Sequence, residues 1–186
     1  MVEINSSFIG KFKVGDNINH NLKILKALYD FRESDRENGD LLLKPITITI
    51  ISIIEAVLYD FHLKPRIFSR EGIVGLPKAI QDYILSKTMD KLEHYIASAK
   101  KHDLFDLADT DFYEALEELR KLRNRVHIQN EKGHFEADES EAFCNERKEQ
   151  AEMVLEKVLR VMAAKHGRGA RFNHVENFIL PWNPHF

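Results

Sequence analysis

Four residues close together in the sequence combine the side-chain types that can cleave a phosphodiester without a metal ion: Arg120, Arg123, Asn124 and His127. Histidine titrates near neutral pH, so its imidazole can take up or release a proton during such a reaction. Arginine binds phosphate oxygens through a planar fork of N–H donors and stabilises the charge that develops on them. The attacking oxygen would be the 2′-hydroxyl of RNA, so this chemistry predicts cleavage of RNA and not of DNA.

The segment that carries these residues, 110–130, predicts one amphipathic helix. Asp111 followed by Glu114 is typical of a helix start. Apolar residues then recur at helical spacing, namely Phe112, Ala115, Leu116, Leu119, Leu122 and Val126. On a regular helix Arg123 projects inside this apolar arc, and His127 follows one turn later at its border. We therefore expect a guanidinium and an imidazole to lie where this helix packs against another surface.

Residues 122–128, with the sequence LRNRVHI, resemble the signature of the HEPN superfamily of small helical bundles. The family pattern is an arginine, often followed by asparagine, with a histidine after four to six further residues. Arg120 and His127 enclose six residues, whereas Arg123 and His127 enclose three. The resemblance extends over about residues 18–166 as an order of helices together with this one motif.

The resemblance implies an assembly and an activity. It implies a homodimer whose two-fold axis brings an arginine and a histidine from each chain into one cleft. The implied activity is that of an endoribonuclease of the toxin or defence kind that needs no metal and no cofactor. His127 with Arg123 or Arg120 would be catalytic, while Asn124, Glu55 and Arg125 would support the site or bind RNA. RNA is then a partner, together with an antitoxin or another protein.

Residues 45–63 predict a second helix, which is buried. Its opening, ITITI, alternates and is β-branched, which locally favours a strand. The segment is nevertheless long for a strand and contains no interior breaker. Glu55 lies in this apolar segment, where an unpaired carboxylate costs several kcal/mol. Glu55 therefore pairs with Arg123 or Arg120, pairs with a second subunit, or lies in water at the rim of the helix.

The arginines and the histidine also have a purely structural interpretation. Arg123 and His127 could form an ion-pair network at the end of the helix with Glu55 or Glu117. The second function class is accordingly a non-catalytic helical dimer that binds a partner protein or a nucleotide. Composition does not separate the two classes, because the net charge of −3 provides no overall attraction to nucleic acid.

Several other chemistries are excluded by the motifs that the sequence lacks. The nine histidines include no HxxxH, HExxH or Cys/His pair with the spacing of a metal site. No glycine-rich loop opens a helix to hold phosphate, and no GxSxG or Cys–His signature predicts covalent catalysis. Cys144 is the only cysteine, so the chain cannot form an internal disulfide, as is typical of a reducing cytoplasm.

The whole pattern predicts an all-α, HEPN-like fold: a single up-down bundle of about five helices. Few glycines and prolines favour helices over a turn-rich β protein. The predicted helices cover residues 17–32, 45–63, 77–101, 110–130 and 138–166, with linkers at 34–40 and 65–75.

Residues 1–16 predict a lead-in, with Gly10 and Gly15 as breakers, and residues 17–166 predict the bundle domain. Residues 167–186 predict an aromatic tail that docks on this chain or on a partner. The N-terminus lacks the apolar core of a signal peptide, and the run 46–54 is too short to cross a bilayer. We therefore expect a cytoplasmic protein without a membrane partner.

Overall fold

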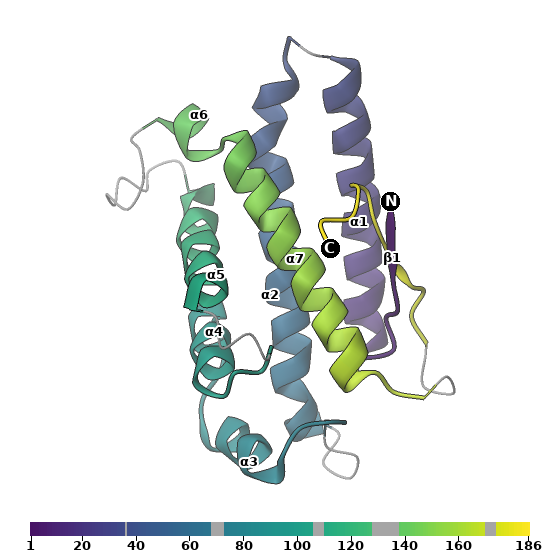
Figure 1. Ribbon diagram of the computed structural model, residues 1–186, viewed down its shortest axis with the longest axis vertical. Coiled ribbons are helices and arrows are strands. Elements are labelled where there is room, and N and C mark those ends of the chain that lie inside the picture. Colours follow the sequence, from purple (N-terminus) through teal and green to yellow (C-terminus); the bar gives the residue numbers. More distant parts are fainter. Residues whose placement is uncertain (36, 68–72, 106–109, 128–137, 170–173) are drawn as a thin grey trace.

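The computed structural model describes residues 1–35, 37–67, 73–105, 110–127, 138–169 and 174–186. These residues form a helical bundle, and one small two-stranded sheet lies along its side (Figure 1). The predicted all-α class is confirmed. Residues 128–130 of the helix predicted over 110–130, residues 68–72 of the predicted linker at 65–75 and residues 170–173 of the predicted tail lie outside the described residues.

Helix α2 (Leu43–Ile67) lies at the centre of the bundle, and its ITITI segment is helical. Helices α1 (Phe12–Ser34), α7 (Asn145–His166), α5 (Thr110–Arg123), α4 (Leu92–Lys101) and α3 (Lys78–Ser86) all pack against it. Its isoleucines are buried on several sides: Ile46, Ile50, Ile51, Ile53 and Ile54. Burial of this apolar surface outweighs the local preference of β-branched residues for a strand.

A short 3-10 helix, η1 (Gly39–Leu42), leads directly into α2. The combined stretch Gly39–Ile67 is long and apolar enough to cross a membrane by length and composition alone. The prediction about membrane crossing concerned the run 46–54, which is only part of this stretch, because the helix extends on both sides of the run. Half of the most apolar window is buried inside the bundle, so the same composition also suits a core helix.

Several predicted boundaries are wrong. Helix α1 starts at Phe12, so Gly15 lies inside a helix instead of ending the lead-in. Pro65 lies in the last turn of α2 and does not begin a linker. The helix predicted over 77–101 is two helices, because the backbone becomes extended at Lys87. The final helix is also interrupted: α6 (Glu139–Ala142) ends before α7 begins at Asn145.

Asp60 explains why α1 starts earlier than the sequence suggests. Its buried carboxylate accepts hydrogen bonds from the backbone N–H groups of Gly10 (2.8 Å) and Lys11 (3.0 Å). Lys11 is the N-cap residue of α1 and has no capping bond from its own side chain, so α2 supplies the cap. Lys64, one turn further along α2, donates to the carbonyl of Phe8, and burial lowers its pKa to about 8.

The C-terminal tail lies against the bundle. Strand β2 (Phe178–Leu180) pairs antiparallel with β1 (Val2–Ile4), with Glu3 opposite Ile179. Figure 1 shows this two-stranded sheet beside α1. The aromatic and aliphatic side chains of the tail that are buried are Val175, Phe178, Leu180 and Trp182. The tail thus adds its apolar surface to the same core as the helices.

Gly15 provides a test of tail docking. A Cβ atom at this position would lie 2.5 Å from both methyl carbons of Val175, and a β-branched side chain cannot turn away easily. Gly15→Ala should destabilise the protein by about 1–2 kcal/mol, since overpacking exceeds the gain in helix propensity. In urea unfolding, Gly15→Ala should cost far less stability when Val175→Ala is already present. Additive effects of the two substitutions would contradict this contact.

His62 provides a test of burial in α2. Its Nδ1 lies 2.7 Å from the carbonyl oxygen of Leu58, and burial lowers its pKa from 6.5 to about 4. The unfolded chain therefore binds one more proton than the native protein between these two values. Stability should fall as the pH drops from about 6.5 towards 4, by about 1.4 kcal/mol per pH unit for this proton.

Urea unfolding at pH 7.5, 6, 5 and 4.5 measures this slope. The His62→Phe variant should lose that part of the pH dependence, whereas substitution of the exposed His20 by Gln should leave it unchanged. Parallel pH profiles of wild type and His62→Phe would show that His62 is not the group responsible.

Candidate functional site

Arg123 is the last residue of α5 and forms an ion pair with Glu55 of α2. Its Nη2 atom lies 2.9 Å from Oε2 of Glu55, and the two side chains are 41% and 26% exposed. The sequence left several alternatives for Glu55, and in the structure Glu55 pairs with Arg123. The two helices pack against each other, and Leu116, Leu119 and Leu122 of α5 are buried, as are Val57 and Leu58 of α2.

Arg120 is held in a different way, by residues of α5 and α4. Its Nε donates to Oε2 of Glu117 at 2.9 Å, and its Nη2 donates to the other carboxylate oxygen of Glu117. Its Nη1 lies 3.8 Å from Oε2 of Glu93 on α4. The hydrogen bonds from Arg120 lower the pKa of the Glu117 carboxyl, so this carboxylate stays charged. Arg120 therefore points along its own helix and towards α4.

His127 is not on the same helix as the arginines, so the predicted helix over 110–130 is too long. Helix α5 ends at Arg123, a 3-10 turn, η2 (Asn124–Val126), follows, and His127 has extended backbone angles. Asn124 and the β-branched Val126 both have low helix propensity, which accounts for this early end. The geometric argument that placed His127 one helical turn from Arg123 is therefore wrong. The imidazole is exposed at the end of the 3-10 turn.

The early end of α5 also gives a structural reason for its basic residues. Arg120, Lys121 and Arg123 lie in the last turn, where positive charge is stabilised by the negative end of the helix dipole. Asn124 is exposed and Arg125 is half-buried in η2, so the basic character continues beyond the helix. The end of α5 thus brings Arg123, Asn124, Arg125 and the exposed His127 together in sequence and space, with Arg120 one turn earlier.

An aromatic group on α2 and α4 lies near Glu55 and was not identified as part of a site from the sequence. Tyr59, one turn after Glu55, is 38% exposed, and its ring centroid lies 6.4 Å from that of Tyr95. The ammonium of Lys11 lies 5.9 Å from the centre of the Tyr59 ring. Burial raises the pKa of Tyr95, and Tyr59 and Glu55 raise it further. The available signal in the sequence was a tyrosine one helical turn after Glu55.

The open side of α2 also carries small residues. Ser52, Ala56 and Tyr59 line a surface hollow of ≈ 170 Å³ together with residues of α1: Val14, Asn17, Ile18 and Asn21. The hydroxyl of Ser52 donates to the carbonyl of Ile48 at 2.8 Å, so this polar group is satisfied within the helix. Within the described residues, no group of three or more His, Cys, Asp or Glu side chains is placed to hold a metal ion.

The ion pair between α2 and α5 can be measured by a double-mutant cycle. Glu55→Ala, Arg123→Ala and the double variant should give a coupling energy of about 0.5–1 kcal/mol in urea unfolding, falling at high salt. The matched control is the exposed pair of Lys13 and Asp16, whose atoms are 2.8 Å apart within α1. This control pair should couple more weakly, because both of its side chains are well solvated. A coupling energy of zero for Glu55 and Arg123 would show that the contact does not position Arg123.

Comparison of this chain with protein-family models, with curated proteins and with solved structures finds no match.

Proposed function

We propose that this protein is a HEPN-like endoribonuclease that acts as a homodimer and needs no metal ion, with its site at the end of α5. The observation that carries the proposal is the position of the exposed His127 four residues after Arg123, whose guanidinium is oriented by Glu55. An oriented guanidinium beside an exposed imidazole is suited to phosphodiester chemistry, because one group binds phosphate while the other moves a proton.

In the proposed reaction, one imidazole removes the proton of the RNA 2′-hydroxyl, and the resulting oxygen attacks the adjacent phosphorus. The bond from phosphorus to the 5′-oxygen breaks, and a protonated imidazole gives its proton to that leaving oxygen. The products are a 2′,3′-cyclic phosphate and a 5′-hydroxyl. Two imidazoles in different protonation states are needed, which is why the proposal includes a second copy of the chain with its own His127.

Arg123 is better placed than Arg120 to bind the reacting phosphate. The Arg123 side chain is 41% exposed, whereas that of Arg120 is 20% exposed and already donates to both oxygens of Glu117. Since His127 lies beyond the helix, the six-residue spacing between Arg120 and His127 does not decide which arginine faces the imidazole. We therefore assign phosphate binding to Arg123 and a positioning role to Arg120, which fixes the last turn of α5 against α4.

The exposed Tyr59 supports RNA as the ligand. Stacking of a base on an aromatic ring contributes about 1–3 kcal/mol to the binding of single-stranded nucleic acid. The ring of Tyr59 is supported by Tyr95 on one side, and the cation of Lys11 lies close to it. A base next to the reacting phosphate could stack here, while Arg125 contributes a further positive charge at the end of α5.

A specific observation also favours the second candidate, a non-catalytic module that binds a partner protein or a nucleotide. Both arginines of the motif already have carboxylate partners, Glu55 for Arg123 and Glu117 for Arg120. Such pairs lower the positive potential that attracts RNA. In this second function the ion pairs hold α5 in place, and the open side of α2 with Ser52 and Ala56 is the contact surface for the partner.

Single alanine variants distinguish these functions. On single-stranded RNA with EDTA present, Arg123→Ala and His127→Ala should each reduce cleavage at least about 100-fold, as expected for loss of a proton donor or a charge-stabilising group. Arg120→Ala should lose less activity than these two variants, provided that circular dichroism shows the same helical content as in the wild type. The matched control is His20→Ala, an exposed histidine on α1 that should retain full activity.

Two further measurements belong to the same experiment. RNA with 2′-O-methyl groups should resist cleavage, and light scattering should return twice the 21.7 kDa chain mass. Equal RNA turnover by wild type and His127→Ala would mean that a contaminant cleaves the RNA. That result would replace the nuclease by the non-catalytic module, and a clean monomer at the assay concentration would contradict a site shared between two copies.

A further inference from the structure

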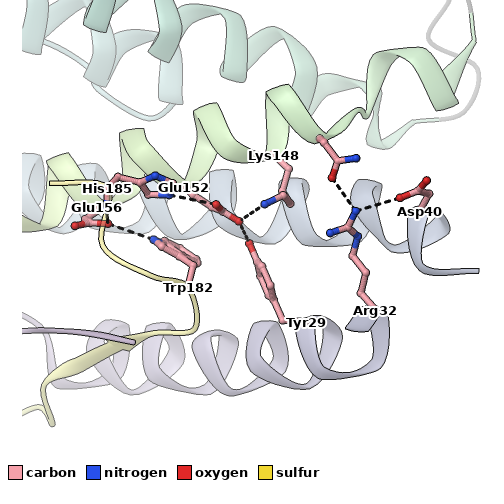
Figure 2. Close-up of polar contacts among 9 residues, drawn as sticks. Tyr29, Arg32, Asp40, Lys148, Glu152, Glu156, Trp182 and His185 are labelled. Carbon is pink, nitrogen blue, oxygen red and sulfur yellow. Dashed lines mark hydrogen bonds and ion pairs between the residues drawn. The ribbon is translucent and has the colours of Figure 1, made fainter. Parts of the chain in front are cut away.

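Two glutamates of α7, Glu152 and Glu156, are buried at 2% and 0% exposure, one helical turn apart. Figure 2 shows them facing the C-terminal segment, which runs between α7 and α1. Tyr29 of α1 closes the other side of this space, and its hydroxyl donates to Oε1 of Glu152. We call the surface formed by Tyr29, Glu152 and Glu156 the tail-binding surface. Buried carboxylates require partners, so whatever segment buries this surface must bring groups that donate hydrogen bonds.

Each glutamate has a cation on its own helix. Nζ of Lys148 lies 2.7 Å from Oε1 of Glu152, one turn earlier in α7. Nε and Nη2 of Arg160 lie 2.8 Å and 2.7 Å from Oε1 of Glu156, one turn later. The negative charges are therefore compensated within α7 itself. If the tail were removed, the second oxygen of each glutamate would become exposed, but each glutamate would keep its cation on α7.

The second oxygen of each glutamate faces the tail. His185 Nε2 lies 3.2 Å from Oε2 of Glu152, and the backbone N–H of His185 donates to Oε2 of Glu156 at 3.2 Å. The indole N–H of Trp182 donates to the same oxygen of Glu156 at 3.3 Å. These contacts are longer than those to Lys148 and Arg160. The tail thus binds through groups that are separate from the ion pairs of α7.

The tail presents these donors in a constrained form. Pro181 and Pro184 fix two backbone torsions on either side of the Trp182–Asn183 pair, which reduces the entropy lost on docking. The ring of Trp182 also lies 6.1 Å from that of Tyr29. The last residue, Phe186, is 58% exposed beside an apolar hollow of ≈ 370 Å³ lined by Phe112, Ala115, Met153, Val154 and other residues of α5 and α7. Recognition therefore depends on residues 181–186 themselves.

We propose that the tail-binding surface also accepts residues 181–186 from a second copy of the chain, in exchange for its own. The acceptor oxygens of α7 and the donors of the tail are complementary whichever copy supplies the tail. Exchange preserves every contact described above, so the closed monomer and the exchanged dimer differ mainly in their connecting segments and in protein concentration. This proposal does not depend on the ribonuclease activity.

A peptide of residues 178–186 with a fluorescent label tests the surface directly. The acceptor is the full chain with Trp182→Ala and His185→Ala, which weakens the competing internal tail. The peptide should bind this acceptor at least tenfold more tightly than a control peptide in which the same Trp and His are alanine. Wild-type protein should bind the peptide at least tenfold more weakly than the acceptor does. Absence of peptide binding to a folded acceptor, or equal binding to wild type, would overturn the proposal.

Exchange between whole chains is tested by complementation. The donor is the full chain with Glu152→Gln and Glu156→Gln, which keeps its tail but weakens its own surface. The acceptor alone and the donor alone should each self-associate only weakly. When the two are mixed, light scattering should detect a complex of twice the chain mass. Where circular dichroism shows that the double acceptor is unfolded, the single variant His185→Ala takes its place in both experiments. Peptide binding without association of the mixed chains would exclude a second copy as the occupant.

Discussion

The burial of α2 is the constraint on which the remaining structure depends. Its isoleucines face several directions, so one neighbouring helix cannot cover them, and α1, α4, α5 and α7 are all required. Polar side chains of this helix can therefore be accommodated only where a neighbouring segment supplies a partner. Asp60 caps α1, Lys64 binds the carbonyl of Phe8, and Glu55 lies at the edge where α5 ends. Each of these polar groups fixes the place of a neighbouring segment because each would be costly to leave unpaired.

The position of the candidate site follows from this arrangement. Arg123 is at the end of α5 and reaches Glu55 because α5, which carries three buried leucines, packs against α2. The helix stops there, and the following 3-10 turn carries the imidazole of His127 away from the helix axis into solvent. An exposed imidazole beside an anchored arginine is thus a consequence of where the helix ends. A longer helix would have placed His127 against the neighbouring surface.

The sequence predicted the helical class, the buried helix through ITITI and the importance of Glu55, because all three depend on apolar periodicity and on the cost of a buried charge. It also predicted the start of α5 and the ends of α4 and α7, but it predicted neither the start of α1 nor the end of α5. Position 15 of α1 is a glycine because Val175 of the tail occupies the place where a Cβ atom would lie. The start of α1 is capped by Asp60, which is far away along the chain. Such contacts between distant segments leave no local pattern. The end of α5 before His127, in contrast, had a local signal in the sequence, namely the low helix propensity of Asn124 and Val126. The prediction gave more weight to Val126 as a member of the apolar helical pattern.

The two arginines of α5 differ in what their ion pairs hold. Arg120 pairs mainly with Glu117, three residues away on the same helix, so that contact orients a side chain but joins no two elements. Arg123 pairs with Glu55 on another helix, so that contact also sets the place of the end of α5. A phosphate that bound Arg123 would compete with Glu55 for the same guanidinium, and the last turn of α5 would then lose one of its links to α2. Ligand binding at Arg123 is therefore coupled to the position of His127, whereas a ligand at Arg120 would compete first with Glu117 on the same helix and then with the longer contact to Glu93 of α4.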